Sequence, residues 1–539
     1  MSPFVDFPAE LLEEILELLS TADLSTLSRT CKELYTFFSP RVYHKIDWTW
    51  DDDKPCPPYH LLLRTLLSNA RLASHIKVLR TRGGGIVPRS HWEEGICNDA
   101  AIDEHYKLCD IRRSVWVEGH RERSSFTSKD VRRVINLISS TAPTDAHRRE
   151  WILEFYRGNV DVIMALILHQ SQAIEELDLG FAFLDHAKFI PRAFKHLIDA
   201  QEAAAVYPHL ASVNLGADGP GIPEWVWTDL DLFRLFIFLP NVKTIDAILL
   251  EPVLFAWPSP HKIPRADALS TLILRQCTIS EDTLEAILSC TPKLKHLVYD
   301  YWRMAECFPP HWECCKDDKN NKSKKSYTQV PIHCPRLSKA LAHVHTTLES
   351  LVLKAQFRGD MLSGPLSRDI KDPFESLCKC YIFGRVTGLD KMLSLKSLEA
   401  SWALLFGWWD FPAPDYRGHP YDGVQGSGDN PWTSVLPPNI RRLCMRDDMS
   451  DFRDYELYSV LADPVPLFRH LLDARRKLFG SLEHVKFAFM YRHDKRDKLP
   501  VQIIRKLRDD CLRAGMACEI IGERIHSPSG KVIGIVPEL

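Results

Sequence analysis

The feature that most constrains the fold is a short apolar pattern that recurs from about residue 170 to about residue 490. In each copy an apolar residue is followed by two others, an apolar residue, one other, and a third apolar residue. The copies begin at Ile174, Leu210, Val242, Leu269, Leu294, Leu348, Phe374, Leu395, Ile440 and Leu482, and the Phe374 copy is broken at its last position. A strand–helix unit that cannot bury its apolar face alone does so by stacking on its neighbours. The pattern therefore predicts an α/β fold with a curved parallel sheet.

A different pattern fills residues 4 to about 45, where apolar residues at steps of three and four predict short amphipathic helices. The face of the first helix, which follows Pro8, carries Leu12, Ile15, Leu16 and Leu19. Ser20 and Asp23 have the spacing of a capping box that opens a second helix. The apolar face of that helix carries Leu24, Leu27 and Cys31. A third helix, from Leu34 to Phe38, is expected to end at Pro40.

Three helices of this size bury little surface alone, so some of their apolar side chains are expected to pack on another part of the chain or on a partner. The stretch resembles an F-box. The family's motif positions are occupied by Phe7-Pro8, Leu11-Leu12-x-x-Ile15-Leu16, Asp23-Leu24 and Thr30-Cys31-Lys32, with Phe7 replacing the usual Leu and Thr30 the usual Val. The alternative is an ordinary helical hairpin packed on the core.

The resemblance implies that the helices dock on the adaptor protein Skp1. The residues expected at that interface are Pro8, Leu12, Ile15, Leu16, Leu19, Leu24, Leu27 and Cys31. The recurring pattern downstream resembles irregular leucine-rich repeats, so the expected architecture is a three-helix F-box followed by a repeat solenoid. This combination resembles the F-box proteins of ubiquitin ligase complexes, especially divergent fungal ones.

That resemblance implies a non-catalytic adaptor that reaches a cullin and its RING partner through Skp1 and holds a protein substrate on its repeats. One alternative is a scaffold that binds Skp1, or partners through its repeats, without ligase function. Another is an enzyme built on the repeat region, which would need a polar pocket that the sequence does not reveal. No motif of a hydrolase, kinase, phosphate-binding loop or metalloprotease is present in the sequence, and no cofactor is expected.

The expected domain organisation follows from these features. It comprises an F-box at 1–45, connecting strands and helices or first divergent repeats at 46–170, repeats at 171–490, and a C-terminal cap at 491–539. After the F-box helices, residues 41–50 and 75–81 are predicted to be strands and residues 61–72 a helix. Loop insertions are expected near 316–326, which is charge-rich, and near 412–432, which is rich in Pro, Gly and Asp.

Composition limits the range of partners and compartments. The 539 residues carry a formal charge of −3 and an isoelectric point near 6.7, which gives no electrostatic footprint for nucleic acid or an anionic membrane. No apolar run reaches the roughly 18 residues of a membrane span. The N-terminus is unlike a signal peptide, so the 15 cysteines are expected to be reduced thiols and the location cytoplasmic, nuclear or both.

Three further groups of residues are candidate sites. Cys307, His311, Cys314, Cys315, His333 and Cys334 include zinc's preferred ligands, but their spacing fits no regular finger, and unligated thiols are the favoured reading. Gly83 to Gly85 follow a strand but complete no phosphate-binding motif, which favours a plain turn. Candidate substrate contacts are the strand residues Glu175, Asp178, Arg441 and Arg442 and the aromatic pair Trp408 and Trp409. The alternatives are solvated strand residues and core aromatics.

Overall fold

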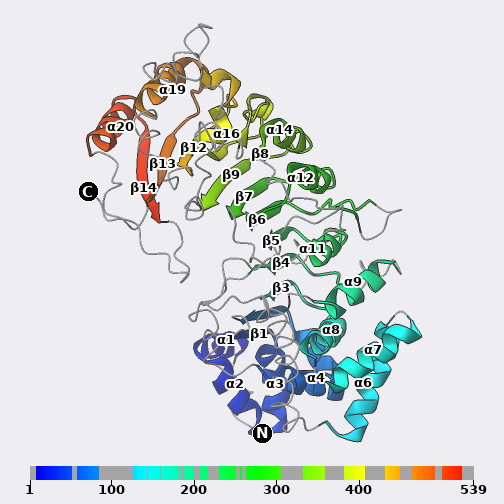
Figure 1. Ribbon diagram of the computed structural model, residues 1–539. Coiled ribbons are helices and arrows are strands. Elements are labelled where there is room, and N and C mark those ends of the chain that lie inside the picture. The colour runs from blue at the N-terminus through cyan, green and yellow to red at the C-terminus, as the bar shows by residue number, and fades with distance from the viewer. Residues whose placement is uncertain are drawn as a thin grey trace, which may run out of the picture. The chain divides into compact units, whose positions relative to one another are not determined.

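The computed structural model describes most of the chain. The described residues are 8–50, 57–83, 126–142, 144–157, 159–180, 183, 187–199, 207–216, 230–249, 255–257, 263–304, 332–358, 382–406, 431–448, 464–491 and 501–524. They fall into two compact units, the first comprising Met1–Ile245 and Trp257–Lys262, and the second Asp246–Ala256 and Ile263–Leu539. Figure 1 shows the elements by label.

The first unit begins with three short helices and continues as alternating strands and helices. The three helices are α1 (Ala9–Leu18), α2 (Thr21–Ser28) and α3 (Lys32–Val42). After them come β1 (Lys45–Trp50), α4 (Tyr59–Ser68), η2 (Ala70–His75) and β2 (Val78–Gly83). The next elements are α6 (Ser128–Thr141), α7 (Asp145–Tyr156), α8 (Val160–Gln170), β3 (Glu176–Leu179), α9 (Phe189–Asp199), β4 (Ser212–Leu215) and α11 (Leu230–Ile237). Strand β5 (Thr244–Ala247) lies where the two units divide.

Strands of the first unit lie in the order in which they occur in the chain, β1-β2-β3-β4-β5. The pairs β1–β2, β2–β3 and β3–β4 are parallel, and Leu79, Leu177 and Val213 are aligned across neighbouring strands. These three side chains are at most 1% exposed. Equivalent apolar residues therefore stack from strand to strand, as expected when each strand–helix repeat buries its apolar face against the next repeat.

The second unit repeats this arrangement. Its elements are β6 (Thr271–Cys277), α12 (Glu281–Leu288), β7 (His296–Met304), β8 (Ile332–His333), α14 (Cys334–Ala342), β9 (Ser350–Arg358), β10 (Ile382–Phe383), η7 (Leu389–Lys391), β11 (Ser397–Ser401), α16 (Trp402–Phe406), η8 (Pro431–Ser434), β12 (Arg442–Asp447), α19 (Pro464–Leu478), β13 (His484–Tyr491), α20 (Val501–Arg513) and β14 (Ala517–Arg524). The main strands lie in the order β6-β7-β9-β11-β12-β13-β14, and β8 and β10 form a separate parallel pair.

The register of the second unit aligns the recurring apolar pattern. The second apolar position of each copy is occupied, from β6 to β13, by Leu272, Leu297, Leu351, Leu398, Leu443 and Val485, and these residues pair in register. All six are at most 1% exposed. Helices α12 and α14 lie along one face of these strands in Figure 1. Leu284 and Ile287 of α12 are fully buried, and its N-cap Ser280 accepts a hydrogen bond from the Thr283 N–H.

Most sequence expectations for the strands are confirmed. Every copy of the pattern coincides with a strand of the parallel arrangement, except the copy at Phe374, which lies outside the described residues. The strands predicted at 41–50 and 75–81 are also present as β1 and β2, in the same parallel order. Strand β14 follows α20 and ends the strand order among the described residues. The predicted domain boundaries stay a prediction.

Two local expectations were wrong. Helix α3 does not end at Pro40 but continues to Val42, where the Tyr43 N–H still bonds to the Ser39 carbonyl at 3.1 Å. A proline removes one helical hydrogen bond. Complete burial of Phe38, one turn from the helix end, holds the helix in place against that loss. The helix expected over 61–72 is instead α4 followed by the 3-10 helix η2, with Asn69 as the non-helical residue between them.

Candidate functional site

The N-terminal helices form a small core of their own. Leu16 of α1, Leu24 of α2, and Leu34 and Phe38 of α3 are between 0% and 7% exposed and form one cluster. Partly buried side chains packed against it are Leu19, Leu27, Cys31, Phe37 and Val42. This core explains why the three helices hold together even though each is too short to be stable alone.

Local capping fixes where the helices begin. The Ser20 hydroxyl accepts from the Asp23 N–H at 3.2 Å while the Asp23 carboxylate accepts from the Ser20 N–H at 3.1 Å, which is the predicted capping box. Hydrogen bonds from Ser20 lower the pKa of the exposed Asp23. Helix α3 is capped by the Cys31 sulfur, which accepts from the Leu34 N–H at 3.5 Å. These caps satisfy backbone N–H groups at the starts of α2 and α3 that no residue within the helix can pair.

An apolar stripe remains uncovered on α1. Leu11 is 47% exposed and Leu18 is 86% exposed, and Ile15 lies between them with intermediate exposure. Steps of four and three residues place these side chains on one face of the helix. Burying exposed leucines of this kind is worth roughly 1.5 to 3 kcal/mol each. The α1 stripe, meaning Leu11, Ile15 and Leu18, is therefore suited to contact with another protein.

The structure divides the predicted Skp1-binding residues into two groups. Leu16 and Leu24 are core residues of the three helices themselves, and Leu19, Leu27 and Cys31 pack against that core. Pro8 is exposed at the start of α1 and Ile15 belongs to the α1 stripe, whereas the side chain of Leu12 lies outside the described part. Leu11, Leu18 and the 41% exposed Tyr35 are exposed apolar residues of the same helices that were not among the predicted Skp1 contacts. Periodicity identifies an apolar face but cannot say which of its edges is covered.

The three helices join the strands directly. Helix α3 ends at Val42 and β1 begins at Lys45, so Tyr43 and His44 alone connect them. The His44 carbonyl accepts from the N–H groups of Lys77 and Val78 at 2.9 and 3.0 Å. Tyr43 is partly buried, and this burial raises its pKa. The connection is therefore held by the same hydrogen bonds that begin the β1–β2 ladder.

The predicted substrate contacts differ in their exposure. Glu175 forms an ion pair with Lys77 at 3.0 Å, and its side chain is 53% exposed. Asp178 was expected at the surface, but its side chain is 2% exposed and accepts from Arg82. Arg441 and Arg442 are both exposed, whereas Trp408 and Trp409 lie outside the described residues. Glu175 and Asp178 belong to the first unit, whereas Arg441 and Arg442 belong to the second.

A buried group of charges lies on β7, β9, β11 and β12 of the second unit. Arg446 donates to Asp448 Oδ1 at 2.9 Å and to Glu399 Oε1 at 2.7 Å, and Lys354 approaches the same Glu399 oxygen at 3.6 Å. The Ala355 N–H donates to the other Asp448 oxygen at 3.1 Å. Asp448 and Arg446 are each 1% exposed. Each of these buried charges has a partner of opposite charge, and the pairing offsets the free energy lost when a charge is removed from water.

Asp300 of β7 belongs to the same group. Burial raises its pKa to about 6, partly offset by the positive charges of Lys354 and Arg446 and by a hydrogen bond from the Gln276 N–H. Gln276 has a φ of 44°, a left-handed conformation that is unusual for a residue other than glycine, at an irregularity of the β6–β7 pairing. The backbone is therefore turned to bring an N–H towards this carboxylate.

Metal-ligating groups do not converge within the described part of the chain. His333 caps α14 by accepting from the Arg336 N–H, and Cys334 is completely buried with its pKa raised to about 12 by burial and by Glu281. The other four residues of the candidate zinc set lie outside the described residues, as do Gly84 and Gly85 of the glycine run. No group of three or more His, Cys, Asp or Glu side chains in the described ranges could hold a metal ion.

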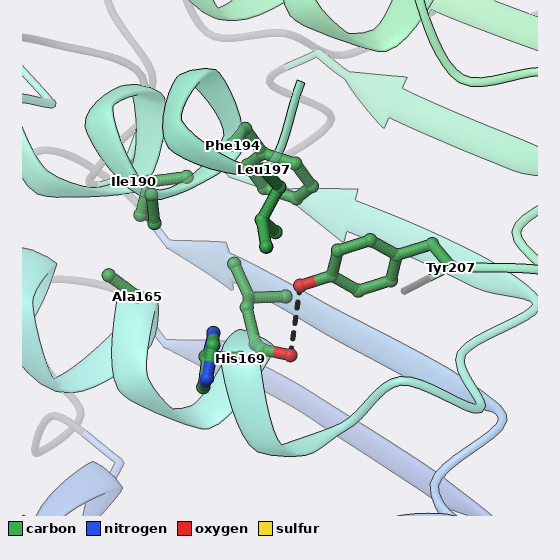
Figure 2. Close-up of a pocket in the computed structure, with 8 residues that line it drawn as sticks. Ala165, His169, Ile190, Phe194, Leu197 and Tyr207 are labelled. Carbon is green, nitrogen blue, oxygen red and sulfur yellow. Dashed lines mark hydrogen bonds between the residues drawn. The ribbon is translucent and has the colours of Figure 1, made fainter. Parts of the chain in front are cut away.

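Figure 2 shows a small cavity between α8 and α9. Its lining is mostly apolar and includes Ala165, Ile190 and Phe194. The Tyr207 hydroxyl donates to the Leu168 carbonyl at 2.9 Å, and burial lowers the pKa of His169. Since the polar groups are few and tied to the packing, the cavity has the character of an imperfectly filled core.

Comparisons with known proteins bear on the N-terminal helices. A search of curated proteins finds no match for the chain. Where the structure describes the chain, no helix combines the length and apolar character needed to cross a bilayer. Among protein-family models, that of the F-box domain matches residues 4–44, the stretch that forms α1, α2 and α3. Residues 4–44 are therefore an F-box domain.

Proposed function

We propose that this protein is a substrate-recognition adaptor of an SCF-type (Skp1–cullin–F-box) ubiquitin ligase. The observation that carries the proposal is the F-box match on three helices that leave the α1 stripe uncovered. In this proposal the helices dock on a Skp1-like adaptor, which links them to a cullin and its RING partner, and the chain itself performs no bond chemistry. We place it in the cytoplasm, the nucleus or both.

The strands that follow would hold a protein substrate. In-register parallel strands in chain order, with aligned buried leucines, support an irregular leucine-rich-repeat solenoid as the body. The two-residue connection between α3 and β1 supports a fixed geometry between the docking helices and the first strands. A fixed connection raises the effective concentration of a bound substrate near the ubiquitin-charged enzyme.

The test is binding of purified Skp1 to the full chain. Leu18→Asp places a charge at the most exposed position of the α1 stripe and leaves the residues of the F-box core unchanged. We expect affinity to fall by at least about 30-fold, because burial of a leucine is worth roughly 2 kcal/mol and a buried carboxylate adds a further cost. The matched control is Leu512→Asp, at a helical leucine of the second unit that is 79% exposed.

Two outcomes would contradict parts of the proposal. Equal Skp1 binding by the Leu18→Asp variant and the unmodified chain would reject docking through the α1 stripe. A complex of the chain with Skp1 that does not bind added purified cullin would instead favour the scaffold alternative. Circular dichroism of both variants checks that the fold is retained.

A further inference from the structure

A row of exposed positive charges lies at one edge of the sheet in the second unit. Strands β7, β9, β11 and β12 are parallel neighbours, so the turns that precede them lie at the same edge. From the end of the preceding helix to the first residue of each strand, these turns contain five Lys or Arg residues and one acidic residue, Glu349. The five are all exposed and are called the basic edge: Lys293, Lys295, Lys396, Arg441 and Arg442. This edge is positive although the whole chain carries a formal charge of −3.

Backbone hydrogen bonds fix the spacing of these charges. The Glu349 N–H donates to the Lys295 carbonyl at 2.8 Å. The Lys396 N–H donates to the Glu349 carbonyl at 2.9 Å, and the Arg441 N–H to the Lys396 carbonyl at 2.8 Å. Neighbouring strands of a sheet lie ~4.8 Å apart. Lys295, Glu349, Lys396 and Arg441 therefore follow one another at regular intervals along the edge.

A carboxylate of the chain already bridges two of the positive charges. The two Glu349 oxygens lie 3.1 Å from Lys295 Nζ and 2.8 Å from Lys396 Nζ. One carboxylate between neighbouring strands thus contacts a cation on each side. In contrast, Arg441 and Arg442 form no ion pair with an acidic side chain in the described ranges. The basic edge therefore has cations left over, at a spacing that suits carboxylates.

An exposed leucine lies at the same edge. Leu393, in the turn before β11, is 63% exposed. Its carbonyl accepts from Asn439 Nδ2 at 3.0 Å, and Asn439 lies two residues before Arg441. The hydroxyl of the neighbouring Ser394 donates to the Thr346 carbonyl at 2.8 Å. These bonds join the turns before β9, β11 and β12, so the leucine and the charges share one fixed surface.

We propose that the basic edge binds an extended acidic segment of a partner protein, with Asp or Glu carboxylates on the cations and an apolar side chain on Leu393. The inference rests on the proposed function, in which this partner is the substrate of the adaptor. Three strand spacings separate β7 from β12, roughly 14 Å in all, which an extended chain covers in about five residues. Alternate side chains of such a segment point to the same side, so roughly two or three carboxylates face the edge.

The size and chemistry of the surface favour an acidic protein segment over a nucleic acid. Binding that depends on the phosphate backbone commonly uses about six to ten phosphate contacts. The basic edge has five cations, and two of them already share Glu349. The exposed Leu393 offers a phosphate backbone nothing, whereas a protein segment can place an apolar side chain against it.

Fluorescence anisotropy with a labelled peptide tests the binding. The probe is a peptide of about eight residues in which Glu alternates with Ser and one Ser is replaced by Leu. In the control peptide every Glu is replaced by Gln. We expect the Glu peptide to bind the full chain at low ionic strength and to be released by salt, because the ion pairs are exposed. The Gln peptide should bind at least about tenfold more weakly, the effect of two or three such pairs.

A double variant tests the arginines. Arg441→Gln combined with Arg442→Gln should weaken binding of the Glu peptide about fivefold, the effect of two surface ion pairs. The matched control is Arg505→Gln combined with Lys506→Gln, at two adjacent exposed cations of α20 in the same unit. This control should bind the peptide as the unmodified chain does.

Two single variants test the other parts of the surface. Glu349→Gln frees Lys295 and Lys396 from their shared carboxylate, so it should strengthen binding of the Glu peptide by about two- to fivefold. Leu393→Ser should weaken binding of the peptide that contains Leu and leave a peptide of Glu and Ser alone unaffected. A surface that only attracts negative charge would not distinguish these two peptides.

Three results would overturn the inference. One is equal affinity for the Glu and Gln peptides, and another is an equal loss of binding in the α20 control. The third is binding of a phosphoserine peptide of the same length when the Glu peptide does not bind, which would assign the edge to phosphate groups.

Skp1 binding by the same variants separates this inference from the proposed function. The Arg441→Gln, Arg442→Gln variant should bind Skp1 normally, and the Leu18→Asp variant should bind the Glu peptide normally. A chain that binds Skp1 but not the Glu peptide would reject the basic edge alone. A chain that binds the Glu peptide but not Skp1 would reject the adaptor function and leave the basic edge as a binding surface.

Discussion

Replacement of Asp300 by Asn gives a pH-dependent test of the buried charges. Burial raises the pKa of this carboxyl from 3.8 to about 6, so the folded state holds its proton more tightly than the unfolded state. The stabilisation is fully present below pH 3.8 and is lost as the pH rises through 6. A shift of this size stabilises the folded state by about 3 kcal/mol in total. Roughly 1.4 kcal/mol of this stabilisation is lost between pH 5 and pH 7.5.

Asparagine does not titrate, so Asp300→Asn removes this dependence. The difference in unfolding free energy between variant and unmodified chain should move in favour of the variant by about 1.4 kcal/mol from pH 5 to pH 7.5. Urea unfolding, followed by hydrogen exchange of β7 and β9 peptides, measures this difference within the second unit. Because it compares two pH values, a constant effect of the substitution on packing cancels.

Glu349→Gln in the same unit provides a contrast of opposite sign. Hydrogen bonds from Lys396 and Lys295 lower the pKa of Glu349 to about 2, so its stabilisation is present above pH 4.5 and lost as the pH falls. This variant should therefore be destabilised at neutral pH, by less than about 1 kcal/mol because the pair is partly exposed and screened. An Asp300→Asn variant whose stability follows pH as the unmodified chain does would refute the argument for Asp300.

Two further predictions concern packing and backbone conformation. Leu24→Ala should cost about 2 to 4 kcal/mol in the F-box core, where Leu24 is 7% exposed, and should appear as faster amide exchange in α1 and α3; unchanged exchange would contradict the observed core. Gly515→Ala should cost about 1 kcal/mol or more because of its φ of 65°, although no atom lies within 4 Å of the added Cβ. Gly480→Ala, with similar free space and no such φ, is the control, and equal thermal stability of the two variants would count against the strain.

The sequence by itself determined which residues of the strands lie on the buried face of the sheet. Leu297, Leu351 and Leu398 recur at fixed positions in their copies, and a period of two residues along a strand sends such positions to one face whatever surrounds them. The F-box was equally visible, because its motif is a local pattern of helix-forming and capping residues. Capping by Ser20 and Asp23 depends on residues three apart, so the sequence alone predicts it.

Pairings between distant residues were decided by the tertiary structure. Asp300, Lys354 and Arg446 occupy separate strands, and only the register of those strands makes them one buried group with a shifted pKa. Electrostatic properties depend on distances in space, which a periodic pattern does not specify.

The F-box helices show both what the sequence determines and what only packing decides. The amphipathic spacing identified α1 as a helix with an apolar face, and the capping box placed α2 after it. Which leucines of α1 are covered depends on how α2 and α3 pack, and that packing buries Leu16 while leaving Leu11 and Leu18 uncovered. Local chemistry thus determined the elements, and packing between them determined which surface is free to bind a partner.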